Sequence, residues 1–141
     1  MSYQFAHAET YSRKKTDKKF SVKEILAEAR RDEGACPHVP NPKEPDLIYG
    51  MELAELEALH DSMCNEAKET NKKGITRGIR KDQQTMGTII LSFPSIKENE
   101  DPADYEKDFE RWKKLSISWL KNKYGDELKT IIEHTDESNP H

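Results

Sequence analysis

Residues 86–94 read Met-Gly-Thr-Ile-Ile-Leu-Ser-Phe-Pro, a short apolar run that ends at a proline. A continuous run of this length with β-branched residues is typical of a strand covered on both faces. Proline has no amide proton to donate to a neighbouring strand, so the strand must end there. The run therefore predicts a central strand, and the other elements can be placed around it.

Two helices are predicted before this strand. Ser21 followed by Glu24 is a capping box, and apolar residues at helical spacing extend this first helix to about residue 31. After Gly50, apolar positions recur every three or four residues, which predicts a second amphipathic helix to about residue 70. Between them, four prolines within residues 34–45 exclude a helix or central strand, so this part is an extended connector.

A third helix is predicted after the central strand. Asp101 and Pro102 supply its N-cap and first-turn proline, and Gly125 lies just past its end. Its apolar stripe is rich in aromatic side chains, and helical spacing explains the stripe as core packing. The stripe consists of Tyr105, Phe109, Trp112, Leu115 or Ser116, and Trp119.

Two more strands complete the expected fold. Residues 2–12 partly alternate aromatic and small side chains, and residues 128–134 are apolar and β-branched. The order strand, helix, helix, strand, helix, strand indicates an α+β fold with helices packed on a sheet. A chain of 141 residues fits one domain, which we expect to span 1–141.

The charge distribution is more informative than the total. A net charge of −4 argues against nucleic-acid binding by bulk charge alone. Residues 13–19 nevertheless form one basic run, and Lys72, Lys73, Arg77, Arg80 and Lys81 form another. Either run is suited to contact phosphates, and a solvated loop is the alternative for each.

The sequence also bears on location. No stretch approaches the roughly 18 apolar residues that a membrane span needs, and the N-terminal residues lack the apolar segment of a secretory signal. We therefore expect a cytoplasmic protein without a membrane partner. In that setting Cys36 and Cys64 should stay reduced.

The final eight residues, His134-Thr-Asp-Glu137-Ser-Asn-Pro140-His141, place two imidazoles and two carboxylates in one short segment. Asp, Asn and Pro favour a turn, and two imidazoles presented by a turn can share one divalent ion. A catalytic metal site generally takes three protein ligands. The spacing alone is a weak signal, because a polar tail that happens to contain two histidines is common.

This segment closely resembles the metal motif of plasmid mobilization relaxases of the Mob/Pre (plasmid recombination enzyme) family. That motif reads His-x-Asp-Glu-Ser-x-Pro-His and continues with one residue and a further His. The stretch Arg77-Gly-Ile-Arg80-Lys81-Asp82 resembles the family's Arg-x-Ile-Arg-Lys-Asp stretch before an apolar strand. The opening Met1-Ser2-Tyr3 is also similar to the family's start.

The resemblance implies an antiparallel sheet flanked by helices, the His-hydrophobic-His endonuclease fold. It implies site- and strand-specific nicking of DNA at a plasmid transfer origin, by metal-assisted transesterification that leaves the protein joined to the 5′ phosphate. His134 and His141 would then be ligands of a divalent metal, Mn or Mg. Glu137 would be an acid/base group beside it, and single-stranded or origin DNA would bind through Arg77, Arg80 and Lys81.

The sequence departs from the family at two places. No residue follows His141, so the third histidine of the motif is missing, and we expect the chain to be the incomplete N-terminal part of a relaxase domain. The family often uses a His followed closely by Arg as nucleophile, and the corresponding region here has no such His. Tyr11, beside the first basic run, is our substitute nucleophile, and an aromatic on the sheet surface is its alternative role. The rival function is a catalytically inactive DNA-binding or interaction remnant.

Overall fold

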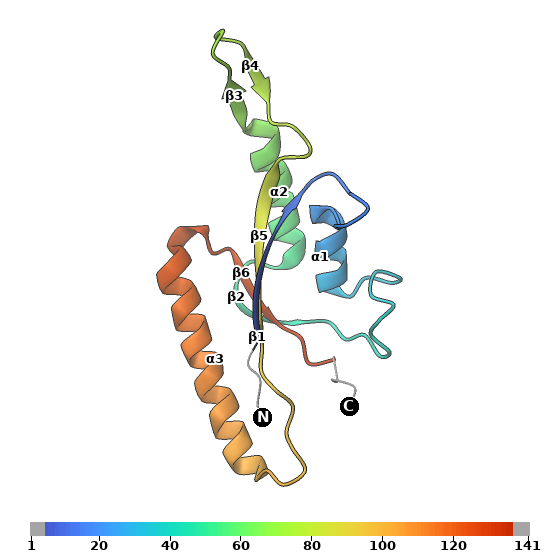
Figure 1. Ribbon diagram of the computed structural model, residues 1–141, viewed down its shortest axis with the longest axis vertical. Helices are drawn as coiled ribbons and strands as arrows, with labels where there is room; N and C mark the ends of the chain where they lie inside the picture. Colours follow the sequence, from blue (N-terminus) through green and yellow to red (C-terminus); the bar gives the residue numbers. More distant parts are fainter. Residues whose placement is uncertain (1–4, 137–141) are drawn as a thin grey trace.

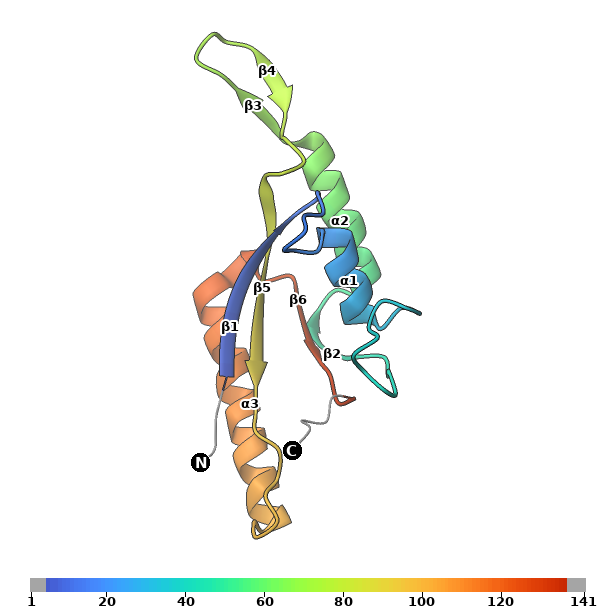
Figure 2. The ribbon, with the colours of Figure 1, turned by 45° about the vertical axis from the view of Figure 1, so that its right-hand side comes forward.

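The computed structural model describes residues 5–136 and confirms the α+β class. Its described part contains three α-helices and three antiparallel sheets of two strands each. The longest sheet pairs β1 (Phe5–Ser12) with β5 (Gln84–Ser92) in the register that places Tyr11 opposite Met86. This ribbon runs through the middle of the molecule in Figures 1 and 2.

Of the two smaller sheets, one lies beside this ribbon and the other beyond its upper end in Figures 1 and 2. β2 (Asp46–Gly50) pairs with β6 (Thr130–Glu133), whereas β3 (Lys68–Thr70) and β4 (Thr76–Gly78) form a hairpin. The hairpin projects beyond the rest of the fold at the top of both ribbon views. Neither β2 nor the hairpin was predicted, because their strands are too short to show a clear alternation of apolar and polar residues.

The three helices begin and end close to the predicted positions. They are α1 (Val22–Arg30), α2 (Leu53–Glu66) and α3 (Pro102–Tyr124), with the 3₁₀ turn η1 (Gly125–Glu127) after the last. The Glu24 amide donates to Ser21 Oγ at 3.2 Å, and the Ala103 amide donates to Asp101 Oδ1 at 2.8 Å. Both predicted caps are therefore confirmed. The connector at 34–45 contains turns and no helix or strand, also as predicted.

The hydrophobic core is small and lies between the helices α1 and α2 and one face of the β1–β5 ribbon. Val22, Leu26 and Leu53 are its buried members. Partly buried apolar side chains pack around them, and one of them, Ile132, comes from β6. The others are Tyr11, Ala29, Leu56 and Met86. The core thus joins β6, the strand that precedes His134, to the main ribbon.

The prediction of a central strand at 86–94 is wrong. Within residues 5–136, β5 pairs with β1 alone, and Ile90 is 51% exposed. The aromatic stripe of α3 reaches the ribbon mainly through Phe93, whose ring centroid lies 5.2 Å from that of Trp112. Farther along α3, Leu115 and Trp119 are 64% and 46% exposed, so only part of the stripe is core packing. On β1, the small side chain of Ala6 lines the groove that this part of the helix faces.

Candidate functional site

The projecting hairpin is an exposed, cationic part of the molecule. Every residue from 68 to 78 is exposed, so the hairpin makes no contribution to the core. Residues 68–82 contain six Lys or Arg against two acidic residues, Glu69 and Asp82. An exposed two-stranded ribbon with this charge attracts anions such as phosphates.

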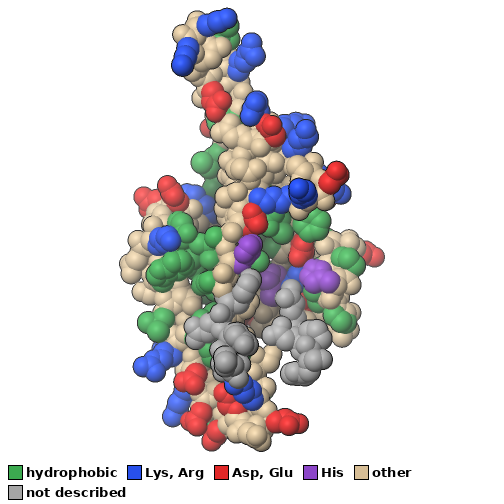
Figure 3. Space-filling model, viewed as in Figure 1, with side chains coloured by type: hydrophobic (Ala, Val, Ile, Leu, Met, Phe, Trp, Pro, Cys, Tyr) green, Lys and Arg blue, Asp and Glu red, His purple; other side chains and the backbone are tan. Residues whose placement is uncertain are grey.

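The loop at 13–19 lies beside the base of this hairpin. Arg13 Nη2 donates to the Ile79 carbonyl at 3.1 Å, which joins the two basic runs across 66 residues of sequence. The loop adds five Lys or Arg against one Asp. We call residues 13–19 and 68–82 together the basic end. Blue side chains are spread over the projecting tip and the region below it in the top half of Figure 3.

The basic end carries a net charge of +8, from eleven Lys or Arg and three acidic residues. Because the whole chain has a net charge of −4, the remaining residues carry −12. Such a separation creates a field that steers anionic partners toward one end of the molecule. The sequence indicated two basic runs, but it did not reveal that they meet.

The structure brings the three predicted DNA-binding residues together at the basic end. Arg77 lies in β4, and Arg80 and Lys81 follow it at the base of the hairpin. The Arg80 side chain is 81% exposed, and its Nε lies 3.2 Å from Asp82 Oδ1. An exposed ion pair of this kind holds the guanidinium only weakly, so it can exchange Asp82 for a phosphate. Their contact with DNA remains a prediction.

Tyr11 occupies a packing position at the end of β1, beside the basic end. Its ring packs against the hydrophobic core, and Lys19 Nζ lies 5.5 Å from the ring centroid. Burial raises the pKa of the Tyr11 hydroxyl above its usual value. A raised pKa favours the protonated hydroxyl, which is the weaker nucleophile. The surroundings therefore suit a packing role better than an activated nucleophile.

His134 directly follows β6, and the chain after it is held by an ion pair that we did not predict. Arg31 Nε and Nη2 donate to Asp136 Oδ2 and Oδ1 at 2.8 and 3.0 Å. The Lys43 amide donates to Asp136 Oδ2 at 2.9 Å. The side chains of Arg31 and Asp136 are only 3% and 1% exposed. We call this bidentate pair the Arg31–Asp136 clasp.

The clasp keeps the Asp136 carboxylate, three residues after β6, in its charged form. Its hydrogen bonds from Arg31 lower the pKa of Asp136 from 3.8 to about 2, so the carboxylate is charged at neutral pH. Arg31 ends α1 in the left-handed conformation, with a φ of 62°. The clasp therefore ties this helix end, the connector and the residues after β6 to one another. The sequence predicted the end of the first helix near residue 31 but did not indicate this partner for Arg31.

The predicted metal site is only partly visible. Glu137 and His141 lie outside the described residues. Asp136 already accepts three hydrogen bonds in the clasp, so it is not available as a metal ligand. No group of three or more His, Cys, Asp or Glu in the part that the structure describes is arranged to hold a metal ion. The residues described do not make a metal site by themselves.

Comparisons with protein-family models, with curated proteins and with solved structures found no match to this chain. Across residues 5–136, none of the helices combines the length and the apolar character that crossing a membrane requires. The features that point to a function are therefore the charge distribution, the geometry described above and the motif resemblance.

Proposed function

We propose that this chain is a relaxase-like DNA-binding domain that engages a plasmid transfer origin through its basic end. The observation that carries the proposal is the convergence of two distant basic runs on one end of the molecule, joined by the Arg13–Ile79 hydrogen bond. Nonspecific affinity for DNA comes mainly from Lys and Arg that release counterions from phosphates. The exposed Lys and Arg side chains of the basic end supply this nonspecific affinity.

The shape of the basic end supports the same partner. The major groove of B-form DNA admits a two-stranded β-ribbon, and β3–β4 is such a ribbon, standing clear of the fold (Figure 2). Thr70 and Thr76 lie opposite each other on one face of the ribbon, and Glu69 and Arg77 share the other. Phosphate contacts by the lysines near the tip would position the ribbon, and the side chains along its faces would meet base edges.

A salt titration tests the binding. The protein would be titrated against a fluorescent DNA of about 30 nucleotides, as a single strand and as a hairpin, at several salt concentrations. For the triple variant Arg77→Ala, Arg80→Ala and Lys81→Ala, we expect the slope of log affinity against log salt to fall by about 2 to 3.

The matched control removes the same charge elsewhere. Lys97→Ala, Lys107→Ala and Lys114→Ala change three exposed lysines at or near α3. We expect this control triple to keep the wild-type slope. Equal slopes for the two triple variants, or no binding by the wild type at low salt, would refute the basic end as the DNA-binding surface.

Strand nicking is the second part of the proposal, and it is supported by the motif resemblance together with the clasp. A relaxase must hold its histidines in a fixed place, and the buried Arg31–Asp136 clasp holds the residue two positions after His134. A divalent metal bound there would withdraw charge from the scissile phosphate. The contribution of the chain itself is to hold His134 at the end of a strand anchored in the core.

An adduct assay separates nicking from the alternative, an inactive DNA-binding remnant. The protein would be incubated with Mn(II) and a labelled origin oligonucleotide, and the covalent protein–DNA adduct would be measured on a denaturing gel. Loss of the adduct in His134→Ala would support a role for His134 in nicking. An adduct that persists in Tyr11→Phe would show that the nucleophile is a residue other than Tyr11. DNA binding without an adduct in the wild type would favour the remnant.

A further inference from the structure

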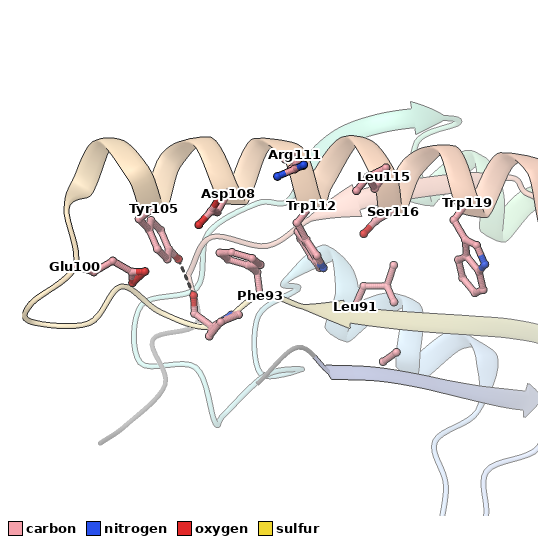
Figure 4. A pocket seen from close by; sticks show the side chains of 12 residues that line it. Leu91, Phe93, Glu100, Tyr105, Asp108, Arg111, Trp112, Leu115, Ser116 and Trp119 are labelled. Atoms are coloured by element: carbon pink, nitrogen blue, oxygen red, sulfur yellow. Dashed lines mark hydrogen bonds between the residues drawn. The ribbon is translucent and has the colours of Figure 1, made fainter. Parts of the chain in front are cut away.

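An open apolar groove runs between α3 and the β1–β5 ribbon, far from the basic end. Its volume is about 640 Å³, and Figure 4 shows Trp112 and Trp119 of α3 pointing toward Leu91 and Phe93. At its mouth, Leu115 and Trp119 are 64% and 46% exposed. Large apolar side chains exposed side by side on one helix mark an interaction surface.

The total surface area of the chain is large enough to include an interface. The chain exposes 10776 Å², whereas a compact monomer of its mass exposes about 7,500 Å². The projecting hairpin explains part of the excess of about 3,300 Å². A stable interface takes only about 800 Å² from each partner, so the remainder is ample for one.

The charges around the groove mouth favour a partner whose own surface has an acidic part and a basic part. Asp108 and Arg111 line the groove. Lys123 lies one helical turn after Trp119, and its Nζ is 4.8 Å from the Trp119 ring centroid. Within α3, residues 102–110 contain four acidic residues and one Lys, whereas residues 111–124 contain five Lys or Arg and no acidic residue. The helix dipole favours acidic residues in the first turn and basic residues in the last turn. It does not account for the charges in the middle of α3.

We propose that a second copy of this chain covers the groove, with the two α3 helices packed antiparallel around a twofold axis near Leu115. At 1.5 Å of rise per residue, this register places Leu115 against its own counterpart. It also brings Asp108 of each copy opposite Lys123 of the other and Arg111 opposite Trp119 of the other. A twofold axis repeats each contact, which is how one bipolar helix becomes complementary to itself. This proposal is independent of DNA binding.

Sedimentation velocity of the full chain over about 1 to 100 µM tests the dimer. We expect a species of twice the 16.3 kDa chain mass, and Leu115→Glu should raise its dissociation constant at least ~100-fold, because it places two carboxylates at the axis. Met63→Glu is the matched control: Met63 is 56% exposed on α2, and its change should leave the dimer intact. Circular dichroism would establish that both variants are folded.

A charge exchange tests the register. Asp108→Lys and Lys123→Asp should each weaken the dimer about 5- to 10-fold, and the double variant should recover most of the loss. A monomer at all concentrations would overturn the proposal. A dimer that survives Leu115→Glu, or a double variant no better than the two single ones, would overturn the antiparallel α3 contact.

Discussion

The Arg31–Asp136 clasp makes the stability of this fold dependent on one carboxylate. The pKa of Asp136 is lowered from 3.8 to about 2, and each unit corresponds to 1.36 kcal/mol, so the charged pair contributes about 2 kcal/mol. Because the pKa of the folded state lies below that of the unfolded state, this contribution is complete above pH ~4 and is lost as the pH falls toward 2.

The perturbation is Asp136→Asn, measured by urea unfolding at pH 7. The expected loss is larger than the linkage value, about 3 to 5 kcal/mol, because Arg31 keeps its charge at 3% exposure without its carboxylate partner. The variant should also show a flatter dependence of the unfolding free energy on pH between 4 and 2.

The matched control is Asp32→Asn. Asp32 accepts from Arg30 on the surface with 49% of its side chain exposed, so its loss should cost less than about 1 kcal/mol. If Asp136→Asn cost no more than Asp32→Asn, the reasoning about the buried clasp would be refuted.

Three further substitutions test the fold. Ser21→Ala removes the capping box with Glu24 and should cost about 1 kcal/mol in urea unfolding, and an unchanged midpoint would contradict the cap. Gly50→Ala should lower the free energy of unfolding several times more than Ser21→Ala does. Gly50 has a φ of 82°, and an added Cβ would collide with the Lys129 carbonyl oxygen. Wild-type stability of this variant would refute the close approach. Leu26→Ala should cost about 2 to 5 kcal/mol, since Leu26 is 4% exposed in a core of few residues, and a loss below 1 kcal/mol would indicate that the core lies elsewhere.

The elements that sequence predicts well here are those encoded by neighbouring residues. Ser21 with Glu24 and Asp101 with Pro102 mark helix starts within four residues, so no knowledge of the tertiary fold is needed. β2 escaped prediction because its five residues become a strand only by pairing with β6, about 80 residues later. A short run carries no local signal of that partner.

In the candidate site too, features encoded by neighbouring residues could be predicted, and contacts between distant residues could not. Arg77, Arg80 and Lys81 could be singled out as a local basic cluster, and their exposure on the hairpin agrees with a surface role. The Arg31–Asp136 clasp spans 105 residues, and an arginine at a helix end is unremarkable in a sequence. Burial, which turns this pair from a surface contact into a structural one, is visible only in the folded chain.

The independence of the β3–β4 hairpin from the core has an evolutionary consequence. Residues 68–78 are exposed throughout, so most substitutions there cost little folding free energy. Proteins diversify fastest where selection on stability is weak, and this ribbon is such a place. A lineage carrying this fold can therefore explore new binding preferences by point substitution in eleven residues, while α1, α2 and the strands beneath them stay unchanged.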